Sequence, residues 1–302
     1  MDGVLWRGRN TLSGSPEFVR TLVAAGKKVL FATNNSLEGP QFYVNKLKAR
    51  GFGDFPLSSI VCPSVVVPRV LKSLSIEGKV YVIGSDAVKQ GIRFDLFDIH
   101  IDLFPYLHFR FRTLHNVEVV DSDSFNDKFP SPAEMLMVEP DHTIKAVIMG
   151  YDHRLNYMKV AYASMLLKDR DAAFVVTNKD VILPGQTYDL PGAGSQIAWL
   201  EAACRRSPIN AGKPEKWMMH CLQETAGVDP ESRTLMIGDN LLTDIAFGQL
   251  HCRASLMVLS GVSTQAQADA VRERTPELAP TFIAPGLSSM VENVGKTIDG
   301  DW

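Results

Sequence analysis

The sequence predicts an α/β fold built on a parallel sheet. Short apolar runs alternate along the chain with longer segments whose apolar residues recur at helical spacing. Strands of a parallel sheet covered by helices on both faces are buried on both sides, so they read as continuous apolar runs. Polar residues directly follow several of these runs, and ligands bind beyond the carboxyl ends of such strands. Those strand ends are therefore the candidate functional positions.

Composition narrows the class of protein. The chain has 302 residues, of which 45% are hydrophobic and 22% charged, which suits one large core or two modest ones. A net charge of -3 gives no electrostatic footprint for nucleic acid or an anionic membrane. No run reaches the roughly 18 apolar residues of a membrane helix, so the expected location is the cytoplasm. The four cysteines form no CxxC pair, which indicates reduced thiols and no thiolate metal site: Cys62, Cys204, Cys221 and Cys252.

The elements follow in a regular order. The first helix is predicted to begin with Ser15 as its N-cap and Pro16 at its first position, and to stop at Gly26. Strands are predicted over residues 28–35, 80–85, 146–152, 172–178 and 234–239, and further helices over 156–169 and 192–207.

The strand in "LFATNNS" ends in a row of short polar side chains. Thr33, Asn34, Asn35 and Ser36, together with their backbone amides, could hold an anionic oxygen. An ordinary Asx turn would explain the same residues. Both interpretations stay open on this motif alone.

Two later motifs carry charges that suit a phosphate and a metal. In "NAGKPEKW", Lys213 stands at the start of a helix, where its ammonium could neutralise a phosphate, although a solvated lysine is the simpler interpretation. In "LMIGDNLLTD", Asp239 and Asp244 face one strand-end crevice, an oxygen-ligand arrangement suited to Mg²⁺. An N-capping aspartate is the alternative there.

Together with Asp2-Gly3 at the start, these pieces resemble the haloacid dehalogenase-like phosphohydrolases in content and order. The closer resemblance is to the group of 4-nitrophenylphosphatases, phosphoglycolate phosphatases and pyridoxal phosphate phosphatases, and it covers most of the chain. It implies a Rossmann-like parallel-sheet core, residues 1–78 and 184–302, with an inserted α/β cap at 79–183. Within the cap, the stretch near 91–132 matches no family motif. It is interpreted as a surface insertion or as an error in the coding sequence.

The resemblance also implies a chemistry: Mg²⁺-dependent hydrolysis of small phosphomonoesters through an aspartyl-phosphate intermediate. Asp2 matches the general acid/base, and its backbone carbonyl would join Asp239 and Asp244 at the metal. Thr33 and Lys213 would bind the phosphoryl oxygens, beside Asn34 and Asn35. In the cap loop "NKDVILP", Ile182 or Leu183 would contact the leaving group, and their apolar character disfavours a dianionic substrate such as phosphoglycolate.

In the family's first motif the nucleophile stands two residues before the aspartate that Asp2 matches, so it would lie directly before Met1. The strand that delivers it would be missing, and its expected neighbours, residues 28–34 and 234–239, would each lose a hydrogen-bonding partner. Two function classes follow. One is a phosphatase whose nucleophile is absent from these 302 residues, and the other is a non-catalytic phosphate-binding relative.

The expected partner is a small phosphorylated metabolite, with neither nucleic acid nor a membrane involved. The aromatic and basic residues near 91–132 leave nucleic-acid binding as a minor alternative. A homodimer formed through the cap is left open.

Overall fold

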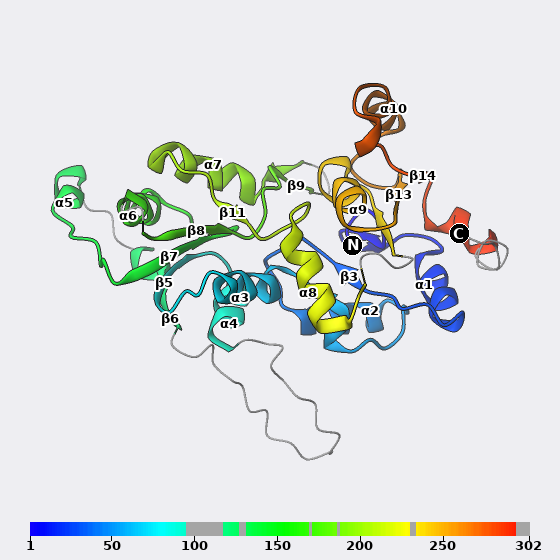
Figure 1. Cartoon of the computed structure of the whole chain (residues 1–302), viewed down its shortest axis with the longest axis horizontal. Coiled ribbons are helices and arrows are strands. Elements are labelled where there is room, and N and C mark those ends of the chain that lie inside the picture. The colour runs from blue at the N-terminus through cyan, green and yellow to red at the C-terminus, as the bar shows by residue number, and fades with distance from the viewer. Residues whose placement is uncertain (95–116, 127–130, 169–170, 186–187, 230–233, 294–302) are drawn as a thin grey trace, which may run out of the picture. The chain divides into compact units, whose positions relative to one another are not determined.

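The computed structural model describes the chain except for residues 95–116, 127–130, 169–170, 186–187, 230–233 and 294–302. The chain divides into two compact units. Unit 1 comprises residues 1–33, 40–61 and 213–302, and unit 2 comprises residues 34–39 and 62–212. Each unit combines helices with parallel strands, which confirms the predicted α/β class (Figure 1).

Unit 2 contains one five-stranded sheet and a separate hairpin. Its elements are α3 (Pro63–Ser73), β5 (Gly78–Ile83), α4 (Asp86–Phe94), β6 (Val117–Asp121), a 3-10 turn (Ser122–Phe125), α5 (Pro132–Leu136), β7 (Ile144–Met149), α6 (Tyr157–Lys168), β8 (Ala173–Val176), β9 (Ile182–Leu183), β10 (Leu190–Pro191), α7 (Ala193–Cys204) and β11 (Ile209–Asn210).

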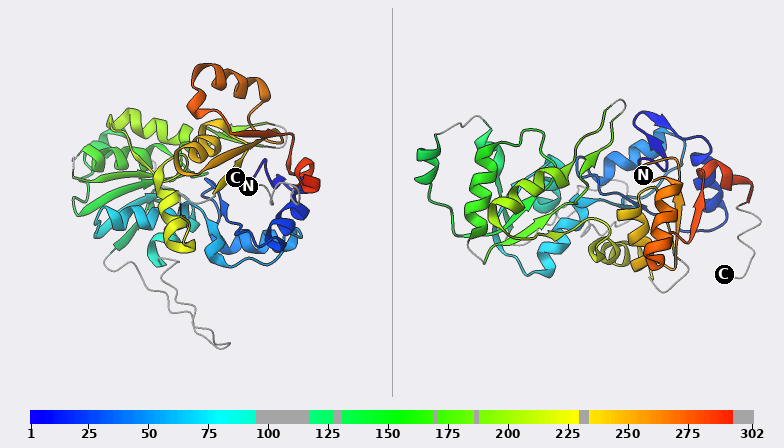
Figure 2. Two further views of the ribbon diagram at one scale, coloured as in Figure 1. Left: turned by 45° about the vertical axis from the view of Figure 1, so that its right-hand side comes forward. Right: turned by 90° about the horizontal axis from the view of Figure 1, so that it is seen from above.

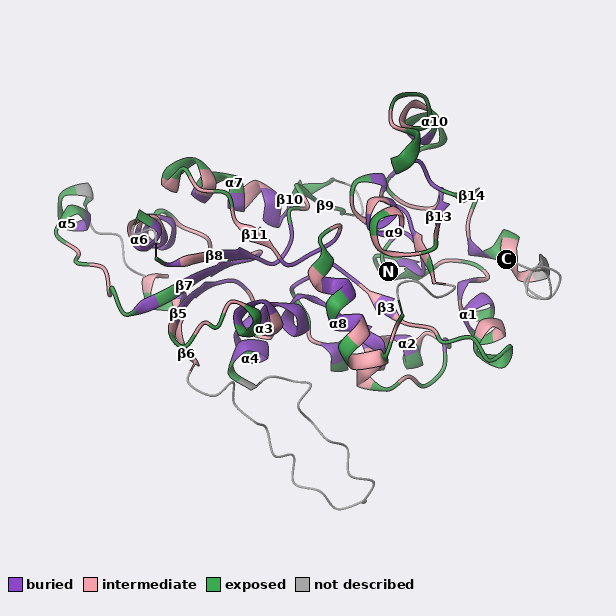
Figure 3. Ribbon diagram, in the orientation of Figure 1, coloured by how far each residue is buried: buried purple, intermediate pink, exposed green. Residues whose placement is uncertain are grey.

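All five strands of this sheet run parallel, in the order β11-β8-β7-β5-β6. Helices α6 and α7 lie on one face and α3 and α4 on the other (Figure 1; a second direction is given in Figure 2). The central strands are buried on both faces, as the purple strands of Figure 3 show. The core between the sheet and α6 and α7 includes Tyr81, Val147, Phe174, Leu167 and Ile197. Apolar runs in the sequence correspond to these strands because neither face meets water.

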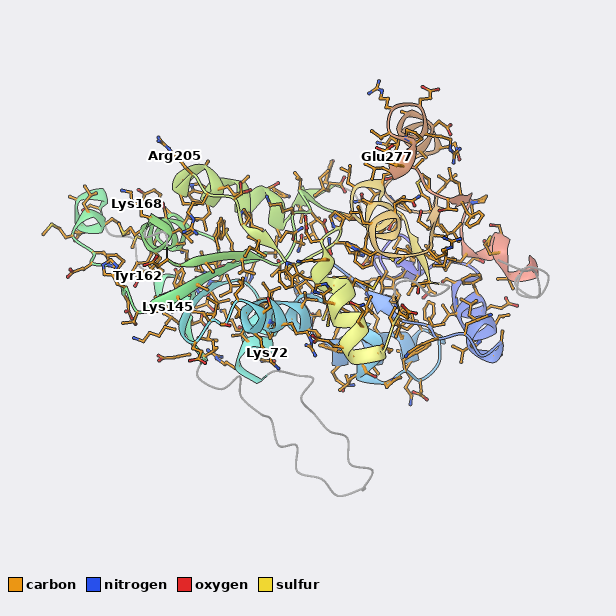
Figure 4. The ribbon with its side chains drawn as sticks, viewed as in Figure 1. Lys72, Lys145, Tyr162, Lys168, Arg205 and Glu277 are labelled. Carbon is orange, nitrogen blue, oxygen red and sulfur yellow. The ribbon has the colours of Figure 1, made fainter. Side chains whose placement is uncertain are left out.

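Several charged residues of unit 2 stand at or near the ends of its elements. Lys72 and Lys168 occupy the last turns of α3 and α6, where a cation interacts favourably with the helix dipole. Lys145 is exposed near the start of β7, and Arg205 follows the end of α7 in the left-handed conformation, with φ 56° (Figure 4). Tyr162 instead points inward, and its ring centroid lies 5.2 Å from that of Tyr81.

Unit 1 holds the two ends of the sequence. Its elements are β1 (Trp6–Arg7), β2 (Asn10–Thr11), α1 (Ser15–Ala24), β3 (Phe31–Ala32), α2 (Pro40–Ala49), a 3-10 turn (Leu57–Ser59), β4 (Ile60–Val61), α8 (Lys216–Ala226), β12 (Leu235–Gly238), a π-helical turn (Leu241–Ile245), α9 (Ala246–His251), β13 (Ala254–Val258), α10 (Gln265–Arg274), a 3-10 turn (Pro276–Leu278), β14 (Phe282–Ala284) and a 3-10 segment (Leu287–Asn293).

The parallel strands of unit 1 form two separate sheets. β3 pairs with β4, while β12, β13 and β14 form a three-stranded sheet. Within the described residues, β3 pairs only with β4 and β12 only with β13, so each has one edge without a strand neighbour. That a further strand belongs between them stays a prediction. The strand predicted over 28–35 is also reduced to Phe31–Ala32.

The start of the first helix differs from the prediction. The N-cap of α1 is Gly14, in the left-handed conformation with φ 72°, and not Ser15. Ser15 is instead the first helical residue, and its buried hydroxyl donates to the carbonyl oxygens of Leu5 and Leu12, at 2.9 and 2.7 Å. The Ser15 hydroxyl therefore makes tertiary hydrogen bonds and does not cap the helix as its local sequence had predicted.

The predicted core and cap boundaries stay a prediction. Helix α7 and strand β11, which follow residue 183, pack within unit 2, because α7 contacts α6 and β11 pairs with β8. The unmatched stretch near 91–132 falls largely outside the described residues, with β6 and the turn after it as its described part. No helix of the described chain combines the length and apolar character needed to cross a membrane.

Candidate functional site

Unit 1 brings Lys213, Asp239 and Asp244 together in a buried cluster. The Lys213 Nζ atom lies 2.6 Å from Asp244 Oδ1, and both residues are at least nine-tenths buried. The same ammonium donates to the carbonyl oxygen of Ala32 at 3.4 Å, one residue before Thr33. Asp239 follows β12 directly and is also buried. Three of the strand-end positions singled out in the sequence, Lys213, Asp239 and Asp244, therefore lie together in unit 1.

The turn after β12 fixes the orientation of Asp244. Its Oδ2 atom accepts from the backbone amides of Asp239 and Asn240, at 3.1 and 3.4 Å. The Asn240 side chain caps the turn by accepting from Leu242 N. The N-capping role considered for the aspartates thus belongs to Asn240. Asp244 sits one turn further on, with one oxygen on the backbone and the other on Lys213.

Burial and charge act in opposite directions on the two carboxyl groups. Burial and, after it, the neighbouring charge of Asp244 together raise the pKa of Asp239 to about 6. Burial also raises the pKa of Asp244, but the Lys213 ammonium outweighs this and holds that pKa below its usual range. Lys213 therefore favours the charged form of Asp244, while Asp239 lies beside it with its charge less fully compensated.

The start of the chain lies against Asp239. Gly3 has φ 74°, and a Cβ atom added to it would lie 2.2 Å from Asp239 Oδ2. The Gly3 carbonyl oxygen accepts from the Ser260 hydroxyl at 2.7 Å. Asp2 itself is exposed. Only glycine fits at position 3, because both its backbone angle and the carboxylate exclude a side chain.

A loop after β13 completes the cluster, and the sequence analysis missed it. Val262 N donates to Asp239 Oδ2 at 2.9 Å, and Ser263 N donates to the Asp239 carbonyl oxygen at 2.9 Å. A Cβ atom on Gly261 would lie 1.9 Å from Asp239 Oδ2. The signal was present, since "SGVS" closely follows the apolar run "SLMVL" and polar residues after a strand mark a candidate site.

Thr33 lies in unit 1 and is buried, with its backbone amide bonded to Val61 O at 3.0 Å. Asn34 and Asn35 belong to unit 2. Asn35 Oδ1 accepts from Leu37 N at 2.9 Å, which is the Asx turn considered as the alternative. Substrate binding by Asn34 and Asn35 stays a prediction.

Asn34 is connected to the loop that follows β8. Its side-chain amide donates to Asp180 Oδ1 at 3.2 Å, and its carbonyl oxygen accepts from Asn178 Nδ2 at 2.8 Å. Asn178 Oδ1 in turn accepts from Asp180 N at 3.0 Å. This loop leads into the β9–β10 hairpin, in which Leu183 is half-buried and Ile182 is 55% exposed. The hairpin therefore presents apolar side chains, as its sequence indicates.

The donor set of the cluster suits a small, hard divalent cation in part. Mg²⁺ typically uses one or two protein carboxylates and completes its shell with water or phosphate oxygens. Asp239 supplies such a carboxylate, and the Gly3 contact places the Asp2–Gly3 backbone against it. Across the described residues no three Asp, Glu, His or Cys side chains gather as a metal site, so protein side chains alone do not enclose a cation.

Comparison with known proteins gives consistent matches. A family model described as haloacid dehalogenase-like hydrolase matches residues 1–94, and a HAD-hydrolase-like model matches residues 210–290. The chain is 31% identical to glycerol-3-phosphate phosphatase of Rattus norvegicus, over 87% of this chain and 78% of the relative. It is 28% identical to phosphoglycolate phosphatase 1A, chloroplastic, of Arabidopsis thaliana, over 98% of this chain and 76% of the relative.

Solved structures show the same fold. A hypothetical protein from Pyrococcus horikoshii is similar with a TM-score of 0.75 and 29% identity, over 97% of each chain. A p-nitrophenyl phosphatase from Archaeoglobus fulgidus is similar with a TM-score of 0.75 and 23% identity, over 97% of this chain and 96% of that one.

Proposed function

Because the chain belongs to the haloacid dehalogenase-like hydrolase family, we propose that it is a Mg²⁺-dependent phosphatase of small phosphomonoesters. The substrates would be of the 4-nitrophenyl phosphate, phosphoglycolate or pyridoxal phosphate type. The observation that carries the proposal is the buried cluster of Lys213, Asp244 and Asp239 in unit 1. A buried ammonium beside two carboxylates supplies a phosphate-binding charge and hard oxygen ligands in one place.

Different residues of unit 1 would bind the phosphoryl group and transfer protons. The Lys213 ammonium and the Thr33 hydroxyl would bind phosphoryl oxygens, and Asp244 keeps the ammonium in place through its 2.6 Å contact. Asp2 would donate a proton to the leaving oxygen and later accept one from the attacking water. Its exposure agrees with a group that exchanges protons with solvent. The nucleophile would be an aspartate directly before Met1, which would form the aspartyl-phosphate.

The metal would be held by Asp239 and the backbone carbonyl of Asp2, with Asp244 beside them. When bound, Mg²⁺ would neutralise enough charge for two anions to approach each other. The loop Ser260–Ser263 serves this role by fixing Asp239 through Val262 N and Ser263 N. The raised pKa of Asp239 supports the assignment, since an incompletely compensated carboxylate is the group that a cation would stabilise.

A second candidate function is phosphate binding without hydrolysis. By the resemblance, the nucleophile would stand directly before Met1, while Thr33, Lys213 and Asp239 are present. A chain with those groups alone would bind phosphate and metal but would not form the covalent intermediate.

The remaining parts of the proposal concern substrate and setting. The apolar Ile182 and Leu183 favour a leaving group without a second anionic charge. The partner would be a small phosphorylated metabolite, with a homodimer through the cap as part of the proposal. Four free cysteines agree with a reducing compartment such as the cytoplasm.

Hydrolysis of 4-nitrophenyl phosphate with and without Mg²⁺ tests the proposal on three chains. One is the 302-residue chain, and two carry an apolar strand before Met1 that ends in Asp or in Asn. We expect Mg²⁺-dependent hydrolysis only from the Asp-ending chain, because losing a nucleophile costs on the order of 10⁶ in turnover. Comparable activity in the 302-residue chain would refute the assigned nucleophile. Phosphate binding without hydrolysis in the Asp-ending chain would favour the second candidate.

A further inference from the structure

Unit 2 has a topological switch point of its own. The connection from β5 leads to β6 on one side, and the next strand, β7, pairs with β5 on the opposite side. The chain therefore leaves β5 and β7 in opposite directions. In open parallel sheets a crevice forms at such a point, beyond the carboxyl ends of the strands, and it is the usual place for a ligand.

A pocket of about 590 Å³ lies at this point. It is lined by the residues after the carboxyl ends of β5, β6 and β7 and by the short segment 37–39, which belongs to the same unit. The Ser85 hydroxyl, directly after β5, donates to the Ser36 carbonyl oxygen and so holds that segment at the pocket. The volume falls within the range of small-molecule sites, about 300 to 1,000 Å³.

Three charged residues of the pocket lining, Lys89, Asp123 and Asp152, belong to a set of ion pairs that continues behind the lining to Asp121 and Lys159. The buried Lys89 ammonium lies 2.8 Å from Asp121 and 2.6 Å from Asp123. The fully buried Lys159 lies 2.5 Å from Asp152 and 3.2 Å from Asp123. Asp152 is held further, since its Oδ1 accepts from Arg154 N at 2.8 Å and its backbone bonds to the Gln196 side chain. These charges are paired within the protein, so a ligand would meet polar groups that are already in position.

The charges that line the pocket select the ligand. Four carboxylates line it, from Glu38, Asp86, Asp123 and Asp152, against the cations of Lys89 and Arg154. Glu38 is exposed. Asp86 Oδ1 lies 3.7 Å from Lys89 Nζ, but the Asp86 side chain is 86% exposed, so both carboxylates can turn toward a bound cation. The N-terminus of α4 would favour an anion, but Asp86 already occupies its first turn. Hydroxyl and amide groups of Ser85, Tyr151 and Gln90 add partners for ligand hydroxyls.

We propose that this pocket, which is lined by residues of unit 2 alone, binds a small hydroxylated amine. The ammonium of the ligand would lie near Glu38 and Asp86, and its hydroxyl groups would lie toward Ser85, Tyr151 and Gln90. The site requires neither the nucleophile nor a metal.

Isothermal titration of the full chain with glucosamine tests the proposal, with glucose as the matched uncharged probe. We expect saturable binding of glucosamine with a dissociation constant below about 10 mM. Glucose should bind at least about fivefold more weakly, because it lacks one exposed charge interaction. The double variant Glu38→Gln, Asp86→Asn should weaken glucosamine binding by at least about fivefold. The variant Glu77→Gln, which removes an exposed carboxylate of unit 2 outside the pocket lining, should leave it unchanged.

Three results would overturn the proposal: no saturable binding of glucosamine, equal binding of glucose, or equal binding by the double variant. Thermal melting of each variant checks that it is folded. Because the measurement involves no turnover, it gives the same answer whether or not the chain hydrolyses phosphomonoesters. Failure here is thereby distinguished from failure of the proposed phosphatase activity.

Discussion

The two units hold their buried charges in different frameworks. In unit 2, Lys89 of α4 and Lys159 of α6 pair with aspartates at the ends of β6 and β7, two strands of one continuous five-stranded sheet. In unit 1, the described parallel strands fall into two sheets, and Lys213 reaches both of them. Its ammonium bonds to Ala32 O of β3 and to Asp244, after β12. In unit 1, the predicted site residue Lys213 therefore links β3 to the turn after β12, and these two strands do not pair with each other.

The largest effect should come from removing that link. Lys213→Met would leave Asp244 as an unpaired buried charge and separate β3 from the turn after β12, at a cost of about 3–5 kcal/mol. Lys159→Met should cost less, near the lower end of that range, because β5, β7 and β8 stay paired through their backbones. Urea unfolding followed by circular dichroism measures both.

The control for this pair is Lys79→Met. Lys79 also contacts a carboxylate, Asp141 at 2.8 Å, but both side chains are about one-third exposed. Its loss should cost about 0–1 kcal/mol. If Lys213→Met were no more destabilising than Lys79→Met, Lys213 would not connect the two sheets of unit 1.

A smaller effect should follow from a methyl group at Gly3. Gly3→Ala places a Cβ atom against the Asp239 carboxylate in a left-handed backbone conformation, so overpacking should cost about 1–3 kcal/mol beyond the backbone strain. Gly26 has nearly the same φ, 71° against 74°, and open space around its Cβ position. Gly26→Ala therefore measures the strain alone, and equal melting temperatures for the two variants would show that Gly3 does not pack against Asp239.

The smallest effect concerns pH and unit 2. Burial raises the pKa of Asp123, but hydrogen bonds from Lys89 and Lys159 outweigh this and lower it from 3.8 to about 2. A carboxylate with a lowered pKa stabilises the fold above its ordinary pKa, and that stability is lost as pH falls from 3.8 toward 2. The Asp123 side chain is 45% exposed, so solvent screening should limit the effect to less than about 1 kcal/mol.

Thermal melting of the unmodified chain and of the Asp123→Asn variant, between about pH 5 and about pH 2, measures this effect. The variant should be less stable at the upper limit and should lose less stability on acidification. An unchanged slope in Asp123→Asn would mean that other carboxylates cause the acid loss.

The sequence predicted those features of the fold and the site that depend on a local pattern of residues. Polar residues after apolar strands identified Lys213, Asp239 and Asp244, and the structure brings these three together. The same rule applied to "SGVS" would have identified the loop that holds Asp239. The α/β class followed from the alternation of elements, because strands that are buried on both faces consist of continuous apolar runs.

Contacts between distant segments were not predictable. Asn34 bonds to Asp180, 146 positions away, and no local pattern relates these two residues. Ser15 looked like an N-cap because its local sequence fits one, but its hydroxyl bonds to Leu5 and Leu12. The pocket of unit 2 depends on the order of strands in the sheet, and spacing along the chain does not reveal that order.

The most direct test of the central claim, that the cluster of unit 1 binds phosphate together with a metal, is calorimetric titration with inorganic phosphate. We predict that the chain binds phosphate in the presence of Mg²⁺ and much more weakly without it. We also predict that Asp239→Asn abolishes the Mg²⁺ effect, while Asp54→Asn, which alters an exposed ion pair of the same unit, leaves it intact. Phosphate binding that is equally tight without Mg²⁺, or unaffected by Asp239→Asn, would contradict the account.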